Sequence, residues 1–262
     1  MKRILLPTDF SEAAHKAIRF AIELFGHEEA TYTLFHVHDF SSLENESLEE
    51  CEERLKNETS QFSSGSHDAI LKIETATGSG NVVEGILNYA RKHDVDMIVM
   101  GTKGRSRPKW MGSNTEEVLL NTKCPVFAIP FDCEYKVPEK VVMPVDPHAP
   151  PSMDDFQKAM IALGNAKPRI FMISVVKDDH KPIIDDDLAQ LLKNDYNCEF
   201  HLVQNGDIAE SILEFNDHIN PDMTILFPGK RQLFKHLLQK SISKRIAHIS
   251  SIPLLSLVKG DN

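Results

Sequence analysis

The sequence is short of positive charge and of long apolar runs, and each shortage excludes a class of protein. Only 29 lysines and arginines stand against 39 aspartates and glutamates, which gives the 262-residue chain a net charge of −10. Because a duplex-binding protein needs a basic face to displace counterions from phosphate, we expect no nucleic-acid partner. No apolar run approaches the roughly 20 residues of a membrane-spanning helix, and the first run ends at Leu6. We therefore expect a cytoplasmic protein with no membrane partner.

Cysteine pairs and metal-ligand clusters are also lacking. Four cysteines are scattered along the chain without a CxxC pair, at Cys51, Cys124, Cys133 and Cys198. This pattern favours reduced and mostly buried thiols over zinc ligands or disulfides. His36 and His38 would place both rings on one face of a strand, but no third ligand accompanies them. We expect no metal site.

The clearest positive feature is an internal repeat, which indicates a duplicated unit. Three blocks recur in the same order with nearly constant spacing: 2–9 with 139–146, 80–100 with 206–226, and 113–130 with 241–258. The last two pairs match without a gap. The repeat places the boundary near residues 131–138 and predicts two domains, 1–131 and 138–259.

Each copy alternates short apolar runs with amphipathic segments. In the first copy the runs are ILLP, YTLFHV, ILKIETA, MIVMG and VFAIP, which are typical of strands buried on both faces of a parallel sheet. Ser11 stands where a helix N-cap belongs and Gly26 where that helix should end. Residues 44–58 predict an acidic helix whose charge indicates a solvated face. The alternation predicts an open, doubly wound α/β sheet.

Ligands of such sheets bind outside the carboxyl ends of the strands, where the strand order reverses. The segments expected there are Pro7-Thr8-Asp9 after the first strand, Val37-His38-Asp39 at the end of the second strand, and the loop from Gly101 to Glu117. Glycines and the start of a helix in that loop predict an anion site, aided by its lysines and arginines. Another interpretation stays open, because Ser113 to Glu116 also forms a capping box that needs no ligand. The GxxxxGK[ST] phosphate loop is absent, since Arg231 follows Gly229-Lys230.

At these residues the chain resembles the universal stress protein family, over nearly all of both halves. The marks are ILLPTDFSE, LFHV, GNVVEGILNYARKHDVDMIVMGTKG and GSNTEEVLLNTKCPVFAIP, taken together and in this order. The resemblance implies an α/β fold with a five-stranded parallel sheet of strand order 3-2-1-4-5 in each half.

The resemblance also implies a site for ATP, with Mg²⁺, in the first half. ATP-binding members carry G-x2-G-x9-G-[ST], and the corresponding residues here are Gly101, Gly104, Gly112, Ser113 and Asn114, which would contact ribose and phosphates. Adenine would be contacted by Pro7, Thr8, Asp9 and Val37. The loop departs from the pattern, because only seven residues separate Gly104 from Gly112 and one of them is Pro108.

The second half departs further from the ATP-binding pattern. Phe227 stands in the place of Gly101, and Lys240 replaces the glycine before Ser241. Single-domain relatives commonly dimerise through their fifth strands, so segments 126–130 and 254–258 are expected to pair within this chain. The expectation is a pseudo-two-fold, intramolecular pseudo-dimer with one degenerate half, and further dimerisation is left open.

The sequence contains no recognisable catalytic constellation. Ser113 has no identifiable histidine and aspartate partners, and FSEAAH lacks the SGGxDS loop of the adenine-nucleotide α-hydrolases. We therefore expect a non-enzymatic stress-response protein that binds an adenine nucleotide or acts through a protein partner. The alternative is an interaction scaffold of the same fold that binds no nucleotide.

Overall fold

The computed structural model describes residues 1–38, 47–63, 72–102, 113–145, 151–176, 192–194, 196–204, 208–227 and 252–257. The described residues divide into two compact units, with the division between Tyr135 and Lys136. This division falls inside the stretch where the repeat predicts a boundary, and the domain limits 1–131 and 138–259 stay predictions.

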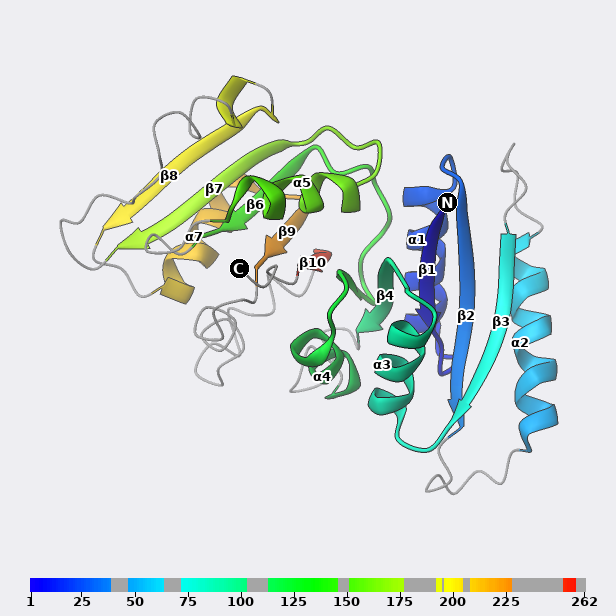
Figure 1. Cartoon of the computed structure of the whole chain (residues 1–262). Helices are drawn as coiled ribbons and strands as arrows, with labels where there is room; N and C mark the ends of the chain where they lie inside the picture. The colour runs from blue at the N-terminus through cyan, green and yellow to red at the C-terminus, as the bar shows by residue number, and fades with distance from the viewer. Residues whose placement is uncertain are drawn as a thin grey trace. The chain divides into compact units, whose positions relative to one another are not determined.

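The first unit alternates strands and helices along the chain (Figure 1). Its strands are β1 (Lys2–Pro7), β2 (Ala30–His38), β3 (Lys72–Ser79), β4 (Met97–Thr102) and β5 (Val126–Pro130). Its helices are α1 (Glu12–Phe25), α2 (Leu48–Ser63), α3 (Val82–Lys92) and α4 (Ser113–Asn121). Every neighbouring pair of strands is parallel and the order is β3-β2-β1-β4-β5. The strand order 3-2-1-4-5 is confirmed.

Helices cover both faces of this sheet. On β2, the ring of Phe35 lies 4.5 Å from that of Tyr89 on α3, whereas His38 lies 3.9 Å from Cys51 on α2. Strand positions that differ by an odd number point to opposite faces, so α2 and α3 lie on opposite sides of the sheet. Helix α1 is on the side of α2, to which it is joined by an ion pair with His15.

The local signals at the ends of α1 are confirmed. The Ala14 N–H donates to Ser11 Oγ over 3.3 Å, which makes Ser11 the N-cap, and Gly26 is the C-cap. Between them α1 buries one apolar face, including Ala17, Phe20, Ala21 and Leu24. Burying that face, rather than helix propensity, supplies most of the stabilisation of a helix of this length.

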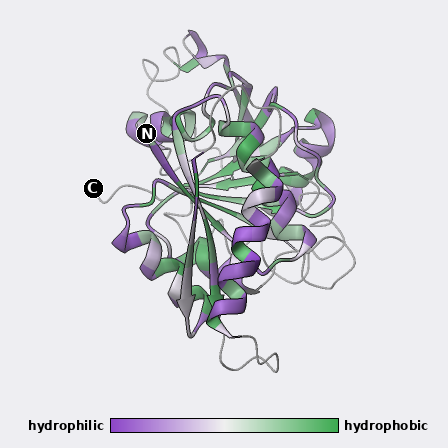
Figure 2. Ribbon diagram, turned by 90° about the vertical axis from the view of Figure 1, so that its right-hand side faces the viewer, coloured by the Kyte–Doolittle hydropathy of each residue, from purple (hydrophilic) through white to green (hydrophobic). Residues whose placement is uncertain are grey.

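The sheet core is apolar, with one exception that the sequence did not predict. Strands β1, β4 and β5 are largely buried. In Figure 2 the strands carry much of the hydrophobic colour, while the helices combine hydrophobic and hydrophilic faces. Strand β3 was expected to be buried on both faces, but half of its residues are exposed and the others are half-buried. The reason is its place at the end of the strand order, where α2 is the main element packed on it.

The second unit repeats this plan. Its strands are β6 (Lys140–Pro144), β7 (Arg169–Val176), β8 (Cys198–Gln204), β9 (Met223–Leu226) and β10 (Leu254–Ser256). Its described longer helices are α5 (Met153–Ala162) and α7 (Ile208–Ile219). The order β8-β7-β6-β9-β10 is again 3-2-1-4-5 when the strands are counted within the unit, and the pairs are parallel.

Equivalent hydrogen bonds occur inside the two units. The Asp96 N–H donates to the Arg3 carbonyl over 2.9 Å, and the Asp222 N–H donates to the Lys140 carbonyl over 2.8 Å. Both aspartate carboxylates in turn accept backbone N–H groups at the start of the first strand of their unit. These contacts support the repeat in the sequence. The pseudo-two-fold arrangement and the pairing of segments 126–130 and 254–258 stay predictions.

The structure also bears on cysteine, metal and membrane. All four cysteines are thiols outside any disulfide. Cys51 and Cys198 are buried, whereas Cys124 and Cys133 are half-buried, so the prediction of buried thiols is right for two of the four. Within the described ranges, no cluster of three or more histidine, cysteine, aspartate or glutamate side chains is arranged to hold a metal ion. In the same ranges no helix combines the length and apolarity needed to cross a bilayer.

Candidate functional site

The topological switch point of the first unit lies between β1 and β4. These strands are neighbours, with Leu5 paired to Ile98, and the connections that leave them run in opposite directions through the strand order. Helix α1 follows β1 on the α2 side, while α4 follows β4 and packs against α3. Such a divergence leaves an open crevice at the carboxyl ends of the strands, where ligands of this sheet type bind.

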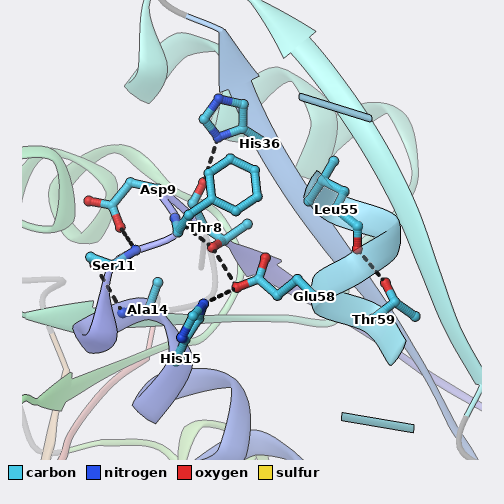
Figure 3. A network of polar contacts seen from close by, with 10 residues as sticks. Thr8, Asp9, Ser11, Ala14, His15, His36, Leu55, Glu58 and Thr59 are labelled. Atoms are coloured by element: carbon cyan, nitrogen blue, oxygen red, sulfur yellow. Dashed lines mark hydrogen bonds and ion pairs between the residues drawn. The ribbon is translucent and has the colours of Figure 1, made fainter. Parts of the chain in front are cut away.

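At the end of β1 the chain makes a tight turn into α1. Asp9 is exposed, and its Oδ1 accepts the Ser11 N–H over 3.1 Å. Thr8 is buried, and its Oγ1 accepts the Phe10 N–H over 3.0 Å. Phe10 has a φ of 60°, a left-handed conformation that is strained for a non-glycine residue. In Figure 3 the Asp9 carboxylate projects away from the buried side chains behind it.

Val37 lies beside this turn, with its side chain in the core and its backbone at the edge. The side chain is buried toward α3, since a Cβ on Gly85 would lie 2.9 Å from its Cγ2. The His38 carbonyl accepts the Gly80 N–H on the β3 side. Because successive residues of a strand direct their N–H and C=O groups to alternate sides, those of Val37 are directed to the β1 side. The β1–β2 register ends at Pro7–Phe35, so its continuation places Val37 opposite Asp9.

Gly101 lies at the end of β4, where close packing requires a glycine. A Cβ on this residue would lie 2.3 Å from the Ala13 carbonyl oxygen of α1. Its own carbonyl accepts the Thr115 hydroxyl of α4 over 3.2 Å. The glycine is thus held between two helices, and this packing alone accounts for the absence of a side chain.

The predicted site residues in the described ranges therefore gather at one edge. Pro7, Thr8, Asp9 and Val37 end the adjacent strands β1 and β2, Gly101 ends β4, and Ser113 and the exposed Asn114 begin α4 next to Gly101. Gly104 and Gly112 lie outside the described residues.

A residue that the sequence analysis missed lies behind this edge. Glu58 is only 3% exposed, although it belongs to the segment that was expected to be a solvated acidic face. Its Oε1 accepts the Thr8 hydroxyl over 3.2 Å and lies 2.7 Å from His15 Nε2 (Figure 3). A signal was present, because Cys51, Leu55, Glu58 and Phe62 follow the 4-3-4 spacing of one helix face, and the other three are apolar.

The environment of Glu58 changes its acidity. Burial raises the pKa of this carboxyl, and the nearby His15, Thr8 and Arg54 lower it by less, so the pKa stays above the ordinary glutamate value. The Oε2 atom is buried and has no hydrogen-bond partner among the described residues. Glu58 is therefore a buried acid whose Oε1 has two polar partners and whose Oε2 has none among the described residues.

His36 and Phe10 complete the polar and aromatic surroundings of Thr8. His36 Nδ1 lies 2.8 Å from the Thr8 carbonyl oxygen, and since a carbonyl only accepts, this nitrogen carries the proton. The Phe10 ring lies 4.7 Å from the His36 ring, and the Arg54 guanidinium lies 3.9 Å from the centre of the Phe10 ring. His36 thus contacts the backbone at the end of β1.

The second unit builds the same edge differently. Val145 takes the place of Thr8. The Val145 carbonyl accepts the Ser174 hydroxyl over 3.3 Å, whereas the Thr8 carbonyl accepts from the His36 ring. Phe156, the fourth residue after the N-cap Ser152, corresponds to His15. Phe227, in place of Gly101, directly follows β9 and is half-buried. Asp146, which corresponds to Asp9 in the repeat, lies outside the described residues.

Comparison with known proteins agrees with this architecture. A sequence model described as the universal stress protein family matches residues 1–130. Universal stress protein MJ0577 of Methanocaldococcus jannaschii is 28% identical over 152 residues, 49% of this chain and 94% of that protein. Universal stress protein MJ0531 of the same organism is 31% identical over 138 residues, 49% of this chain and 81% of that protein.

A solved structure extends the similarity of fold to both halves. The universal stress protein from Archaeoglobus fulgidus superposes with a TM-score of 0.72 at 18% identity, over 99% of this chain and 97% of that one. At this identity the likeness concerns the fold alone. The family is shown by the sequence comparisons: with a matching family model and a 31% identical relative, this chain belongs to the universal stress protein family.

Proposed function

We propose that the first unit binds an adenine nucleotide at the edge formed by the ends of β1, β2 and β4, and that the protein acts in the stress response without catalysing a reaction. The observation that carries the proposal is the β1–β2 register, which ends at Pro7–Phe35 and whose continuation brings Val37 opposite Asp9. In that continuation a backbone N–H, a backbone C=O and an exposed carboxylate are neighbours beside the switch point.

This set of groups suits the edge of an adenine base. Adenine presents an amino donor next to a ring-nitrogen acceptor. The Val37 N–H matches the ring nitrogen, and the Val37 carbonyl or the free oxygen of Asp9 matches the amino group. Ribose and phosphates would then extend toward β4 and the start of α4, where Ser113 and Asn114 lie. Bound Mg²⁺ would offset phosphate charge and would need oxygen ligands.

The proposal is tested by titrating the purified full-length chain with ATP and Mg²⁺ while following thermal unfolding and heat of binding. Binding to the folded state alone at a concentration 100 times the dissociation constant adds about 2.7 kcal/mol of stability. Asp9→Asn keeps an acceptor for the Ser11 N–H but removes the charge, and should weaken binding about 10-fold, the equivalent of one charge-assisted hydrogen bond. Asp217→Asn, at an exposed position of α7 in the second unit, is the matched control and should bind as the unaltered chain does.

The interaction scaffold without a nucleotide is supported by a separate observation. The absence of a side chain at Gly101 is explained by the approach of Ala13 without any ligand. This second function predicts an unchanged melting temperature through millimolar ATP, together with no nucleotide in the mass spectrum of material released by heat denaturation. Either result would reject the nucleotide site and leave a protein partner as the ligand of the fold.

A further inference from the structure

The buried contact between Glu58 and His15 joins α2 to α1 directly behind the candidate nucleotide edge. Glu58 Oε1 is 2.7 Å from His15 Nε2 and 3.2 Å from Thr8 Oγ1. Figure 3 shows the three side chains converging from α2, α1 and the end of β1. The His15 side chain is 29% exposed and that of Glu58 is 3% exposed, so protons can exchange with solvent through the histidine.

The second unit shows that the fold does not need this polar cluster. The positions of Thr8 and His15 are taken there by Val145 and Phe156, which are 5% and 1% exposed. A buried ion pair is on average no more stabilising than apolar residues of similar volume, and an unsatisfied buried oxygen such as Glu58 Oε2 is costly. The first unit therefore keeps an arrangement that packing alone does not favour.

The cluster is connected to the residues that present Asp9. Thr8 Oγ1 donates to Glu58 and accepts the N–H of Phe10, and the two bonds use the same hydroxyl. The Phe10 N–H bond holds the left-handed conformation at Phe10, immediately after Asp9. A change in the hydrogen bonding of Glu58 is thus passed through one oxygen atom to the turn that carries the exposed carboxylate.

Few other titratable groups of the described ranges can act on Glu58. From α1 the group is His15, and from α2 itself it is Arg54, one turn away. From β2 the titratable side chains on the α2 side include His36, which contacts the Thr8 carbonyl, and His38, which lies 3.9 Å from Cys51. From β1 only the uncharged Thr8 reaches the carboxyl.

We propose that Glu58 is a positioning residue for the nucleotide site, an inference that rests on the proposed function. A proton held between Glu58 and His15 then sets the pH range in which the adenine nucleotide binds. With one proton on the pair, Glu58 Oε1 accepts from both His15 and Thr8 and the turn is held. A second proton places a cationic imidazole against a neutral carboxylic acid, and loss of the proton leaves a buried carboxylate without its counter-ion. Affinity is therefore highest at intermediate pH and lower on both sides.

The test is the dissociation constant of ATP with Mg²⁺, measured by calorimetry between about pH 5.5 and pH 8.5, a range that spans the ordinary histidine pKa. Glu58→Gln keeps the shape and removes the titrating acid, and His15→Gln keeps a donor and removes the titrating base. Glu53→Gln, an exposed position on the same helix, is the control. The dissociation constant of the unaltered chain, divided by that of Glu58→Gln, should pass through a minimum at intermediate pH. The ratio should rise about 5-fold at lower and at higher pH, which is the lower end of typical coupling between sites. The His15→Gln ratio should do the same, and the Glu53→Gln ratio should stay constant.

A ratio for Glu58→Gln that stays constant with pH, while ATP still binds, would overturn this inference and leave the nucleotide site intact. No ATP binding by the unaltered chain at any pH would overturn both.

Discussion

Gly101 on β4 and Ala13 on α1 approach so closely that a Cβ atom on the glycine would lie 2.3 Å from the Ala13 carbonyl oxygen. Backbone cannot yield as a side chain can, so Gly101→Ala must separate α1 from β4. We expect a loss of about 1–3 kcal/mol in the free energy of unfolding, the usual cost of overpacking. Urea denaturation followed by circular dichroism measures it.

Gly85→Ala is the matched control for this substitution. Its Cβ would lie 2.9 and 3.1 Å from Cγ2 and Cγ1 of Val37, which are side-chain atoms and not backbone. Gly85 is inside α3, where alanine is favoured over glycine by about 1 kcal/mol, so the net change should be small. Equal losses in the two variants would mean that the backbone of α1 is not the cause.

Replacing the polar cluster with apolar residues should be tolerated only when all of it is replaced. His15→Phe alone leaves Glu58 buried without its ion-pair partner and should cost about 1–3 kcal/mol of stability. The triple variant T8V/H15F/E58L follows the apolar choice of Val145 and Phe156 in the second unit and should recover most of that loss. Urea denaturation of both variants tests this, and a triple variant as unstable as His15→Phe would contradict it.

Much of the fold follows from short-range features of the sequence. Apolar runs marked the strands because a parallel sheet buries both faces of its central strands, and Ser11 marked the start of α1 because its hydroxyl binds a free N–H. The strand order came from the family resemblance. Strand β3 was misjudged, since its exposure depends on its position at the end of the sheet order, which its own residues do not encode.

The cluster behind the site was missed for a different reason. Glu58 lies in a helix with four exposed glutamates in its first two turns, Glu49, Glu50, Glu52 and Glu53. Composition alone predicts that all the glutamates of such a helix face solvent. The helical period, however, places Glu58 on the same face as the buried Leu55 and away from the four exposed glutamates. Its partners His15 and Thr8 are 43 and 50 residues away in sequence, and only the folded chain shows that they meet it.

The pH dependence of stability should carry the signature of Glu58. Burial holds its folded pKa above the ordinary value, so between those two pKa values the folded state binds more protons than the unfolded state. Stability from this group is therefore greatest below the unfolded pKa and falls as pH rises through the folded pKa. The unfolding free energy of the unaltered chain minus that of Glu58→Gln should decrease with rising pH, by at most about 1.4 kcal/mol per pH unit.

Urea denaturation at a series of pH values above about 4, near the ordinary glutamate pKa, measures that difference. Glu53→Gln, which removes an exposed carboxylate of the same helix, should follow the unaltered chain. A difference that grows with pH would show that the His15 ion pair outweighs burial in setting the acidity of Glu58.

Asp222 should give the opposite pH dependence in the second unit. Burial by itself raises its pKa, but the carboxylate accepts the N–H groups of Glu139 and Lys140 over 2.8 and 2.9 Å and pairs with Lys136, and together these lower the pKa below the ordinary value. Its contribution to stability is present above the unfolded pKa and is lost as pH falls through the folded pKa. Asp222→Asn should therefore cost about 1–2 kcal/mol near neutral pH, and the cost should shrink toward about pH 3, below the ordinary aspartate pKa.

The equivalent aspartate of the first unit is the internal comparison for this effect. Asp96 accepts a single backbone N–H, that of Arg3, over 2.7 Å. Asp96→Asn removes one charge-assisted hydrogen bond, whereas Asp222→Asn removes two and an ion pair. Asp96→Asn should therefore cost less stability than Asp222→Asn at neutral pH. Urea denaturation of both variants near pH 7 and near pH 3 compares the costs. An Asp222→Asn cost that is constant with pH would show that the negative charge contributes nothing to the loss.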